Sequence, residues 1–263
     1  MVYVKIIDTI DHGGSYMKIQ HFENNPEIQF DIDLIARIVH AINKAVTVNI
    51  PQQLHDQHLE TNNYIAHMRG DWINENLRRS VVTEGVDLVC FRRTSWRGRL
   101  LVDHRSKTSY SITTMENLRR IPKKHRLRPH FLQTILSVEN SGYEGQYSQI
   151  SFLPDVFSPE EYECDYSEIF AGMLNPDSGY LHCVIAYSAE ADEITDIRLE
   201  FLDPNFYVVD ELSLTEYIRP DFAKLTEASW QTDAVEVPSE SSKSLPQLKA
   251  AVVAKLREIE KQG

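Results

Sequence analysis

The sequence lacks the features by which membrane-spanning and exported proteins are usually recognised. It contains no apolar run of about 18 residues, the length that a membrane helix needs. Its first residues, roughly 30 in number, contain no basic stretch followed by an apolar one, so no signal peptide is indicated. We therefore expect a cytoplasmic protein without a membrane partner.

Cysteine is also scarce. The chain has three, Cys90, Cys164 and Cys183, and they lie far apart in the sequence. An odd number of widely spaced cysteines does not provide a disulfide framework, so we expect them to be reduced and buried. Burial raises the pKa of a thiol, which makes Cys90 and Cys183 poor nucleophiles. His182 is no base for Cys183, because neighbours on a strand point to opposite faces.

Motifs that identify common metal, nucleotide and redox enzymes are missing. The sequence has no His-Glu-x-x-His, no Cys-x-x-Cys, no phosphate-binding glycine loop and no dinucleotide fingerprint. The nearest approach to a metal site is the pair His55 and His58, to which His67 or Asp71 could add a ligand. We favour the alternative that these are polar surface side chains, so neither a metal site nor a cofactor is predicted here.

The apolar pattern that is present predicts an α+β fold with a mixed or antiparallel sheet and helices packed on it. Strands are predicted at residues 2–7, 16–22, 86–91, 99–104, 108–113, 180–188 and 194–202. Helices are predicted at residues 31–50, 54–80, 113–121, 129–138 and 158–174. We expect one globular domain over residues 1–231, with a subdivision near residue 140 left open.

The end of the chain has a different composition. Residues 232–243 are rich in Ser and Glu and poor in large apolar side chains, which is typical of an acidic linker. In residues 244–263, Leu248, Val252 and Leu256 recur at helical spacing. We predict a C-terminal amphipathic helix there.

Several residues predict where helices begin and end. Asp31 is a candidate N-cap for the first long helix, and Pro51 is expected to end that helix. Ser158-Pro159-Glu160-Glu161 combines a capping box with proline in the first turn. Thr113-Thr114-Met115-Glu116 has the spacing of a second capping box.

Positive charge is concentrated in residues 92–128, which we call the basic island. The island holds 12 of the 27 basic residues and only two of the 39 acidic residues, Asp103 and Glu116, whereas the whole chain has a net charge of −12. So many cations cannot all be buried, and strand alternation places Arg97 and Arg99 on the same side of a sheet. The island is therefore the strongest functional signal in the sequence.

Clustered Lys and Arg bind phosphate groups, and aromatic side chains beside them stack on unpaired bases. The residues predicted to bind nucleic acid are Arg97, Arg99, Arg105, Lys107, Arg119, Arg120, Lys123, Lys124, Trp96 and Tyr110. An alternative stays open, in which the island forms an electrostatic seam with the acidic residues of 131–263, within one chain or between copies. Homo-oligomerisation is therefore also left open.

Carboxylates near the island could hold Mg²⁺ for phosphodiester hydrolysis, because this hard cation prefers oxygen ligands. The candidate catalytic residues are Asp87, Asp103, Glu200 and Asp203. No lysine follows them at the acid-x-Lys spacing of many nucleases. Surface acids without a catalytic role remain the favoured interpretation, and Mg²⁺ is expected only if the chain is a nuclease.

The segment Trp96-Arg97-Gly98-Arg99-Leu100-Leu101, followed by Asp103 and Tyr110-Ser111, resembles uncharacterised proteins of Gram-positive bacteria and their prophages. The resemblance covers about fifty residues, and genes for such proteins often lie near toxin–antitoxin or phage-defence loci. It implies no catalytic residues. It does imply a role in conflict between bacterium and phage.

Two hypotheses about function follow. In the first, a cytosolic bacterial or prophage protein binds nucleic acid through the basic island, as a metal-dependent nuclease or toxin if it is an enzyme. In the second, the chain is a non-enzymatic interaction module, such as an antitoxin, immunity or anti-defence factor. Its acidic surface at 131–263 would then bind a basic protein partner.

Overall fold

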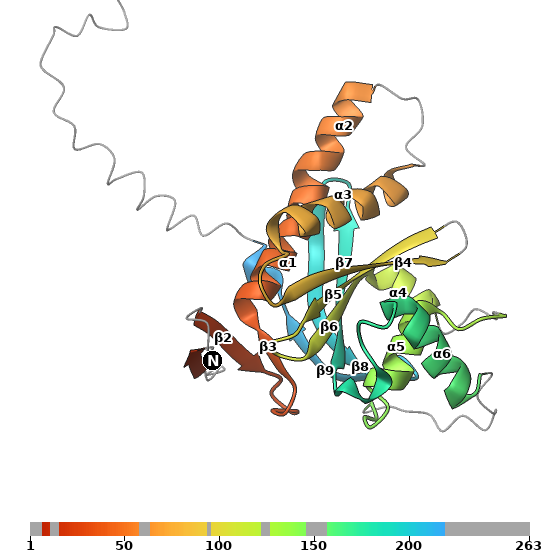
Figure 1. Cartoon of the computed structure of the whole chain (residues 1–263). Helices are drawn as coiled ribbons and strands as arrows, with labels where there is room; N and C mark the ends of the chain where they lie inside the picture. The colour runs from red at the N-terminus through yellow and green to blue at the C-terminus, as the bar shows by residue number, and fades with distance from the viewer. Residues whose placement is uncertain are drawn as a thin grey trace, which may run out of the picture. The chain divides into compact units, whose positions relative to one another are not determined.

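The computed structural model describes residues 7–10, 16–57, 64–93, 96–121, 127–145 and 157–218 (Figure 1). The predicted linker and C-terminal helix lie outside the described residues, as do His58, Lys123 and Lys124 and most of the predicted strand at 2–7. Among the described helices, none has the length and apolar character needed to cross a membrane.

A six-stranded mixed sheet forms the centre of the fold, in the order β4-β5-β6-β7-β8-β9. Neighbouring strands are antiparallel except β6 and β7, which are parallel. The strands are β4 (Val86–Arg93), β5 (Trp96–Asp103), β6 (Thr108–Thr114), β7 (Leu181–Glu190), β8 (Glu193–Leu202) and β9 (Val208–Ser213). The predicted α+β class and the meander of β4, β5 and β6 are confirmed.

A second, antiparallel sheet consists of β1 (Ile7–Ile10), β2 (Tyr16–His21) and β3 (Gln29–Asp31). Strand β6 precedes residue 140 in the sequence and β7 follows it, yet the two strands pair directly. The six-stranded sheet is therefore continuous across the subdivision that the sequence left open.

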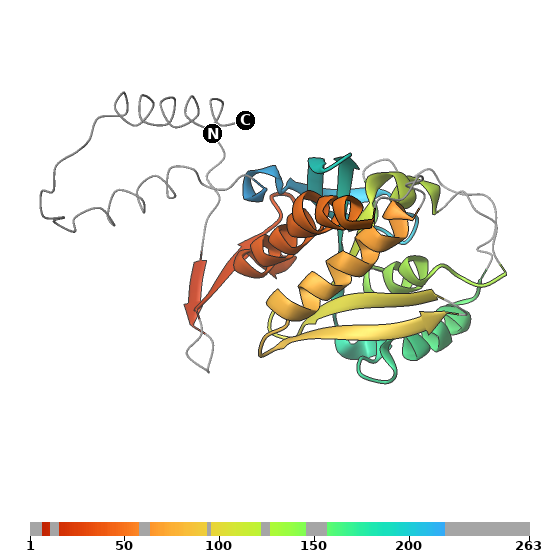
Figure 2. The same ribbon diagram turned by 90° about the horizontal axis from the view of Figure 1, so that it is seen from above.

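Helices cover both faces of the large sheet. The helices are α1 (Ile32–Lys44), α2 (Ile50–Gln57), α3 (Ile65–Ser80), α4 (Met115–Arg120), α5 (Phe131–Glu139) and α6 (Pro159–Phe170), with short 3₁₀ turns at Pro176–Ser178 and Thr215–Tyr217. Helices α1 and α3 share a core with residues of β4 to β9, while α5 and α6 pack on the other face of β4 and β5. Figure 2 shows α1 and α3 across the yellow strands from the green helix α6.

Asp31 begins α1 as predicted, because its side chain accepts hydrogen bonds from the backbone N–H groups of Asp33 and Leu34. The prediction that Pro51 ends this helix was wrong. A π-helical turn at Ala45–Asn49 follows α1, and the backbone N–H of Ile50 bonds to the carbonyl of Ala45. The wider turn changes which backbone N–H and carbonyl groups bond to each other just before the proline ring. A new helix, α2, therefore begins at Ile50 with Pro51 in its first turn.

The two predicted capping boxes have different outcomes. Ser158 and Glu161 form the predicted reciprocal pair at the start of α6. At α4 the N-cap is Thr114 rather than Thr113, and its hydroxyl accepts from the backbone of Asn117. Thr113 instead accepts from the Asn117 side chain.

The large sheet divides between β5 and β6. Strand β5 is paired with β4 along its whole length, but only Leu101, Val102 and Asp103 pair with β6. Strand β6 is paired with β7 through all seven of its residues. Beyond the three-pair ladder, residues 96–100 of β5 diverge from residues 111–114 of β6. Strands β4 and β5 therefore form an arm, which we call the β4–β5 arm.

A buried ion network holds the closed end of this division. Arg105 contacts the carboxylates of Asp103 at 2.9 Å and Asp31 at 3.0 Å. Asp103 is 0% exposed and also accepts from the hydroxyl of Ser106 at 2.9 Å. A buried carboxylate is tolerated only when it is paired and hydrogen-bonded, and this network meets both conditions. It links the N-terminus of α1 to the turn between β5 and β6.

Gly98 allows the arm to pack closely. A Cβ atom at this position would lie 2.2 Å from the ring of Phe91, its cross-strand partner on β4. We predict that Gly98→Ala lowers the free energy of unfolding by about 1–3 kcal/mol, because Phe91 must leave its packed position. Gly142→Ala is the control, since a Cβ there meets nothing within 4 Å. Equal urea midpoints for Gly98→Ala and wild type would contradict the prediction.

Candidate functional site

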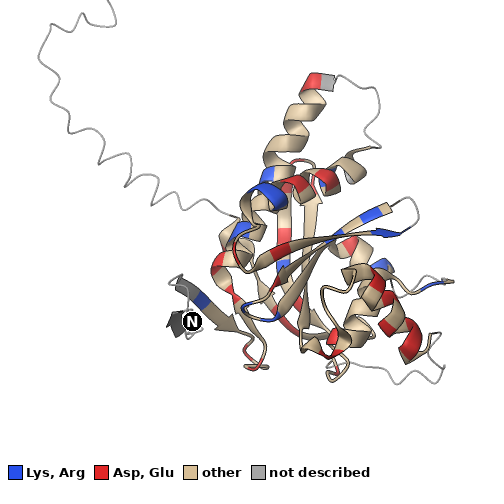
Figure 3. Ribbon diagram, viewed as in Figure 1, with Lys and Arg blue, Asp and Glu red and all other residues tan. Residues whose placement is uncertain are grey.

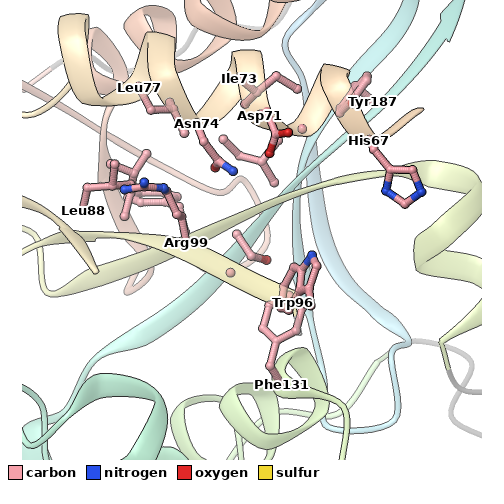
Figure 4. A pocket seen from close by; sticks show the side chains of 16 residues that line it. His67, Asp71, Ile73, Asn74, Leu77, Leu88, Trp96, Arg99, Phe131 and Tyr187 are labelled. Atoms are coloured by element: carbon pink, nitrogen blue, oxygen red, sulfur yellow. The ribbon is translucent and has the colours of Figure 1, made fainter. Parts of the chain in front are cut away.

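A cleft of about 280 Å³ opens where the β4–β5 arm diverges from β6 (Figure 4). Its walls come from α3, β4, β5, β6, β7 and the first residue of α5. The lining residues are His67, Gly70, Asp71, Ile73, Asn74, Leu77, Leu88, Trp96, Gly98, Arg99, Leu101, Tyr110, Ser111, Ile112, Phe131 and Tyr187. The volume lies near the lower end of the range of about 300–1,000 Å³ typical of small-ligand sites.

Helix α3 contributes a polar wall. His67, Gly70, Asp71 and Asn74 recur at helical spacing and all line the cleft. Figure 4 shows Asp71 and Asn74 pointing from α3 toward the strands. A Cβ at Gly70 would meet nothing within 4 Å, so this glycine leaves open space at the wall.

The opposite wall is the free edge of β5. Arg99 and Trp96 lie on different faces of this strand, yet both line the cleft because the cleft is a gap in the sheet. Trp96 packs against the rings of Phe91 and Phe131, with centroid distances of 5.5 and 5.4 Å. It remains 48% exposed. Its indole is thus fixed in position while much of its surface stays accessible.

Part of the basic island is used inside the fold. Arg93 and Arg128 both contact Asp165 of α6, a carboxylate that is almost completely buried. Arg128 also contacts Glu168. These pairs form a seam between the island and the acidic second half of the chain, which was the alternative interpretation. Of the predicted nucleic-acid ligands, Arg105 belongs to the ion network with Asp31 and Asp103.

Other cations of the island are exposed. Arg97 and Arg99 lie on the same face of β5, as predicted, and the arm carries much of the blue in Figure 3. Among the described residues, neither Arg97 nor Arg99 has a carboxylate within ion-pair distance. Lys107 is exposed in the turn at the closed end of the sheet division, about 20 Å from Trp96 along β5.

Helix α4 carries two more of the predicted ligands. Arg119 and Arg120 are both exposed, and Arg120 pairs with Glu116 one turn earlier. The proposed stacking role of Tyr110 is not supported, because its side chain is only 1% exposed and belongs to the core. Among the two aromatic candidates, Trp96 alone presents an accessible ring at the cleft.

The four candidate catalytic carboxylates do not meet. Asp87 and Asp103 project from opposite faces of the sheet, and Asp103 is used by Arg105. A carboxylate oxygen of Asp87 lies 2.9 Å from Nε2 of His104. Asp203 accepts backbone hydrogen bonds that shape the turn after β8, and Glu200 lies on β8 beside Arg198 and Glu211. Within the described ranges, no three His, Cys, Asp or Glu side chains are placed to share a metal ion.

The cysteines are free, but two of the three are not buried as predicted. Cys90 and Cys164 are exposed, and Cys183 is buried. Arg99 on the neighbouring strand approaches the sulfur of Cys90 at 2.8 Å. His182 and Cys183 do point to opposite faces, since Cys183 is in the core under α1 and α3.

A chain of buried polar groups begins at the cleft. Ser111 lines the cleft although it is only 2% exposed, and its hydroxyl lies 3.0 Å from Nε2 of His182. Nδ1 of His182 lies 2.6 Å from the hydroxyl of Ser109, which donates to Glu139 at 2.5 Å. Tyr166 donates to the other oxygen of Glu139 at 2.6 Å. We call Ser111, His182, Ser109 and Glu139 the buried polar chain.

Burial shifts both ionisable groups of this chain toward their neutral forms. Desolvation raises the pKa of Glu139 to about 7. The hydrogen bonds from Ser109 and Tyr166 favour the ionised carboxylate and lower the pKa, but their effect is smaller. Desolvation also lowers the pKa of His182 to about 3. The imidazole is therefore neutral over the whole physiological range, while Glu139 changes its charge near neutrality.

Asn140 fixes the position of His182. Its side-chain amide donates to the carbonyl of His182 at 2.9 Å and accepts from the backbone N–H of the same residue at 2.8 Å. It also donates to the carbonyl of Leu202 at 2.7 Å. The end of α5 is thereby tied to strands β7 and β8, so the backbone of His182 is held in one place.

The sequence interpretation missed the α3 wall and the buried polar chain. The stripe of His67, Gly70, Asp71 and Asn74 was detectable, because polar residues at helical spacing mark a face that does not enter an apolar core. The buried polar chain had no local signal. Its members come from two strands and a helix, which are brought together by the parallel pairing of β6 with β7 and by the contacts of Asn140 at the end of α5.

Comparison with known proteins identifies one relationship. A family model described as a family of unknown function (DUF5986) matches residues 28–262. No curated protein matches the chain. No solved structure matches it either.

The raised pKa of Glu139 predicts a pH-dependent stability. The folded state binds this proton more tightly than the unfolded state, so the stabilisation is present below about pH 4.5 and is lost as the pH rises through about 7. Glu139→Gln has no carboxyl to titrate at this position, so its stability does not fall as the pH rises through about 7. Relative to wild type, the variant should gain about 2.5 kcal/mol of unfolding free energy between pH 5 and pH 8, measured by urea titration. A difference that does not change with pH would contradict the assignment.

Proposed function

Since the chain belongs to the DUF5986 family, whose function is unknown, we propose from the cleft alone that it binds single-stranded nucleic acid. One unpaired base would stack on Trp96 at the cleft, and the adjoining phosphates would lie along Arg97 and Arg99. One observation supports the proposal most directly: β5 combines a half-exposed, firmly packed indole with two guanidinium groups. Among the described residues, neither guanidinium has a carboxylate within ion-pair distance.

The cleft offers different chemistry to the two parts of a nucleotide. Phosphate is attracted to the cations of the arm, whereas Asp71 on α3 would repel it. Asp71 accepts hydrogen bonds and Asn74 both donates and accepts, so the α3 wall suits the edge of a base. A nucleotide therefore fits best with its base toward α3 and its phosphate toward Arg97 and Arg99.

Single strands suit the cleft better than duplexes. Base stacking on an aromatic ring requires an unpaired base, and the cleft is a narrow gap between strands. The proposal is for binding and not for hydrolysis, because the candidate carboxylates Asp87, Asp103, Glu200 and Asp203 form no cluster within the described residues. Three of them, Asp87, Asp103 and Asp203, also have other partners. A role in conflict between bacterium and phage stays a prediction of the sequence resemblance.

The salt dependence of binding tests the cation part of the proposal. For fluorescent single-stranded oligonucleotides, Arg97→Ala/Arg99→Ala should weaken binding and reduce the slope of log K against log salt by about 1.4, for two lost phosphate contacts. Lys107→Asn is the matched control, since it removes one island charge at the closed end, and Asn tolerates the positive φ of 53° found there. That control should bind like wild type.

Two outcomes would reject the cation assignment. An equal loss per removed charge, so that the control shows about half the loss of the double variant, would mean that net charge is responsible and not the β4–β5 arm. Absence of salt-sensitive binding by the wild type at physiological salt would reject nucleic-acid binding altogether. The hypothesis of a protein partner for the acidic surface at 131–263 would then be the one to test.

Filling the cleft tests the base-binding part. Gly70→Leu should raise the free energy of unfolding by about 0.5–1 kcal/mol, because leucine favours a helix interior and the position is open. The same side chain projects into the cleft, so oligonucleotide affinity should fall by at least about tenfold, as on losing one stacked base. Gly142→Leu adds the same side chain elsewhere and should leave affinity unchanged. Normal binding by a stable Gly70→Leu protein would place the base outside the cleft.

A further inference from the structure

The buried polar chain can carry its hydrogen bonds in only one direction at a time. Ser109 and Ser111 each have a single hydroxyl proton, and a neutral imidazole has a proton on only one of its two nitrogens. His182 is fully buried and stays neutral, so the number of protons in the chain is fixed by Glu139 alone. The direction at one end therefore determines the direction at the other.

When Glu139 is ionised, it accepts from both Ser109 and Tyr166. Ser109 then has no proton left for His182, so Nδ1 of His182 must donate to Ser109. Nε2 carries no proton and accepts from Ser111. In this state the Ser111 proton points inward, and the cleft meets only the lone pairs of its oxygen.

When Glu139 is protonated, Tyr166 continues to donate to Oε1, and the new proton on Oε2 is donated to Ser109. Ser109 keeps its own proton and turns it toward Nδ1 of His182 as a hydrogen-bond donor. The single imidazole proton is then on Nε2, which donates to Ser111. The Ser111 proton is then no longer needed inside the protein. It becomes available to an acceptor in the cleft.

We infer that protonation of Glu139 reverses this chain and converts the Ser111 hydroxyl from an acceptor facing the cleft into a donor facing the cleft. The site described above would thus prefer acceptor groups, such as phosphate or base carbonyl oxygens, when Glu139 is protonated. Only the choice of ligand rests on the proposed function; the reversal itself belongs to the protein without ligand.

Other titratable groups near the two ends are few and can be separated from Glu139. The ionisable neighbours of the carboxyl are Tyr166 on α6 and Tyr180 and Cys183 at β7. Burial is the main cause that raises the pKa of each of them, and Glu139 adds to it. All three are neutral near pH 7. At the cleft, His67 is an exposed ionisable side chain, so it must be replaced before the pH dependence of binding is measured.

The direct test is the tautomer of His182, read from imidazole ¹⁵N chemical shifts of the full chain between about pH 5 and about pH 9. A His182→Gln sample identifies its signals among those of the other histidines. We expect the proton on Nδ1 at high pH and on Nε2 at low pH, with a midpoint near 7. Glu139→Gln should show the Nε2 proton at every pH, because the amide donates permanently to Ser109.

Ser109→Ala is a second variant. It removes the hydroxyl that links Glu139 to His182 and keeps both of those residues. It should show no tautomer change at the midpoint of Glu139. A single His182 tautomer throughout the pH range in wild type would overturn the inference. So would a change that persists in Glu139→Gln.

Binding of a single-stranded oligonucleotide, measured in a His67→Gln background at constant salt, tests the consequence for the cleft. Affinity should be about three- to tenfold higher at pH 6 than at pH 8, as expected for one added hydrogen bond. Ser111→Ala should abolish this pH dependence. Equal affinity at the two pH values despite a tautomer change would overturn the coupling to the cleft.

The two proposals fail in distinguishable ways. A wild-type tautomer change without oligonucleotide binding at either pH would reject the proposed function and support the reversal of the chain. Oligonucleotide binding without a tautomer change would support the proposed function and overturn the reversal.

Discussion

The three-pair ladder between β5 and β6 is the constraint on which the rest of the structure depends. Strand β6 pairs with β7 through seven residue pairs, and β5 pairs with β4 through eight. Within the sheet, the two halves are joined by the three-pair ladder between β5 and β6. The ion network of Arg105 with Asp31 and Asp103 secures its closed end. Where the ladder stops, the cleft begins, and side chains from both faces of β5 reach it.

Much of this fold was readable from the sequence, because caps and periodicity are local. Asp31 and Ser158 mark helix starts through hydrogen bonds to residues two or three positions away. The prediction for Pro51 failed because it used a local rule. The rule that proline ends a helix assumes an unbroken series of α-helical hydrogen bonds, and the π-helical turn before Pro51 interrupts that series. Local rules predict elements well, but they do not include such compensations.

The candidate site was only partly predictable, because its residues are joined by tertiary contacts. The basic island was a correct indication of surface charge near β5, but sequence could not separate cations that pair with Asp165 from those that remain on the arm. Nor could it place Ser109 and Glu139 beside His182, since their contacts span 30 to 73 residues. Charge segregation indicates a region, whereas side-chain pairing determines which members of that region are available.

The open position at Gly70 has a consequence for comparing members of the family. A glycine inside a helix weakens that helix, and here it leaves empty the space that a side chain would take from the cleft. Helix strength and cleft size are thus set in opposition by one residue. A relative with alanine or leucine at the equivalent position would have a firmer α3 and a smaller cavity, so a single column of aligned sequences would sort the family by the size of ligand that each member can admit.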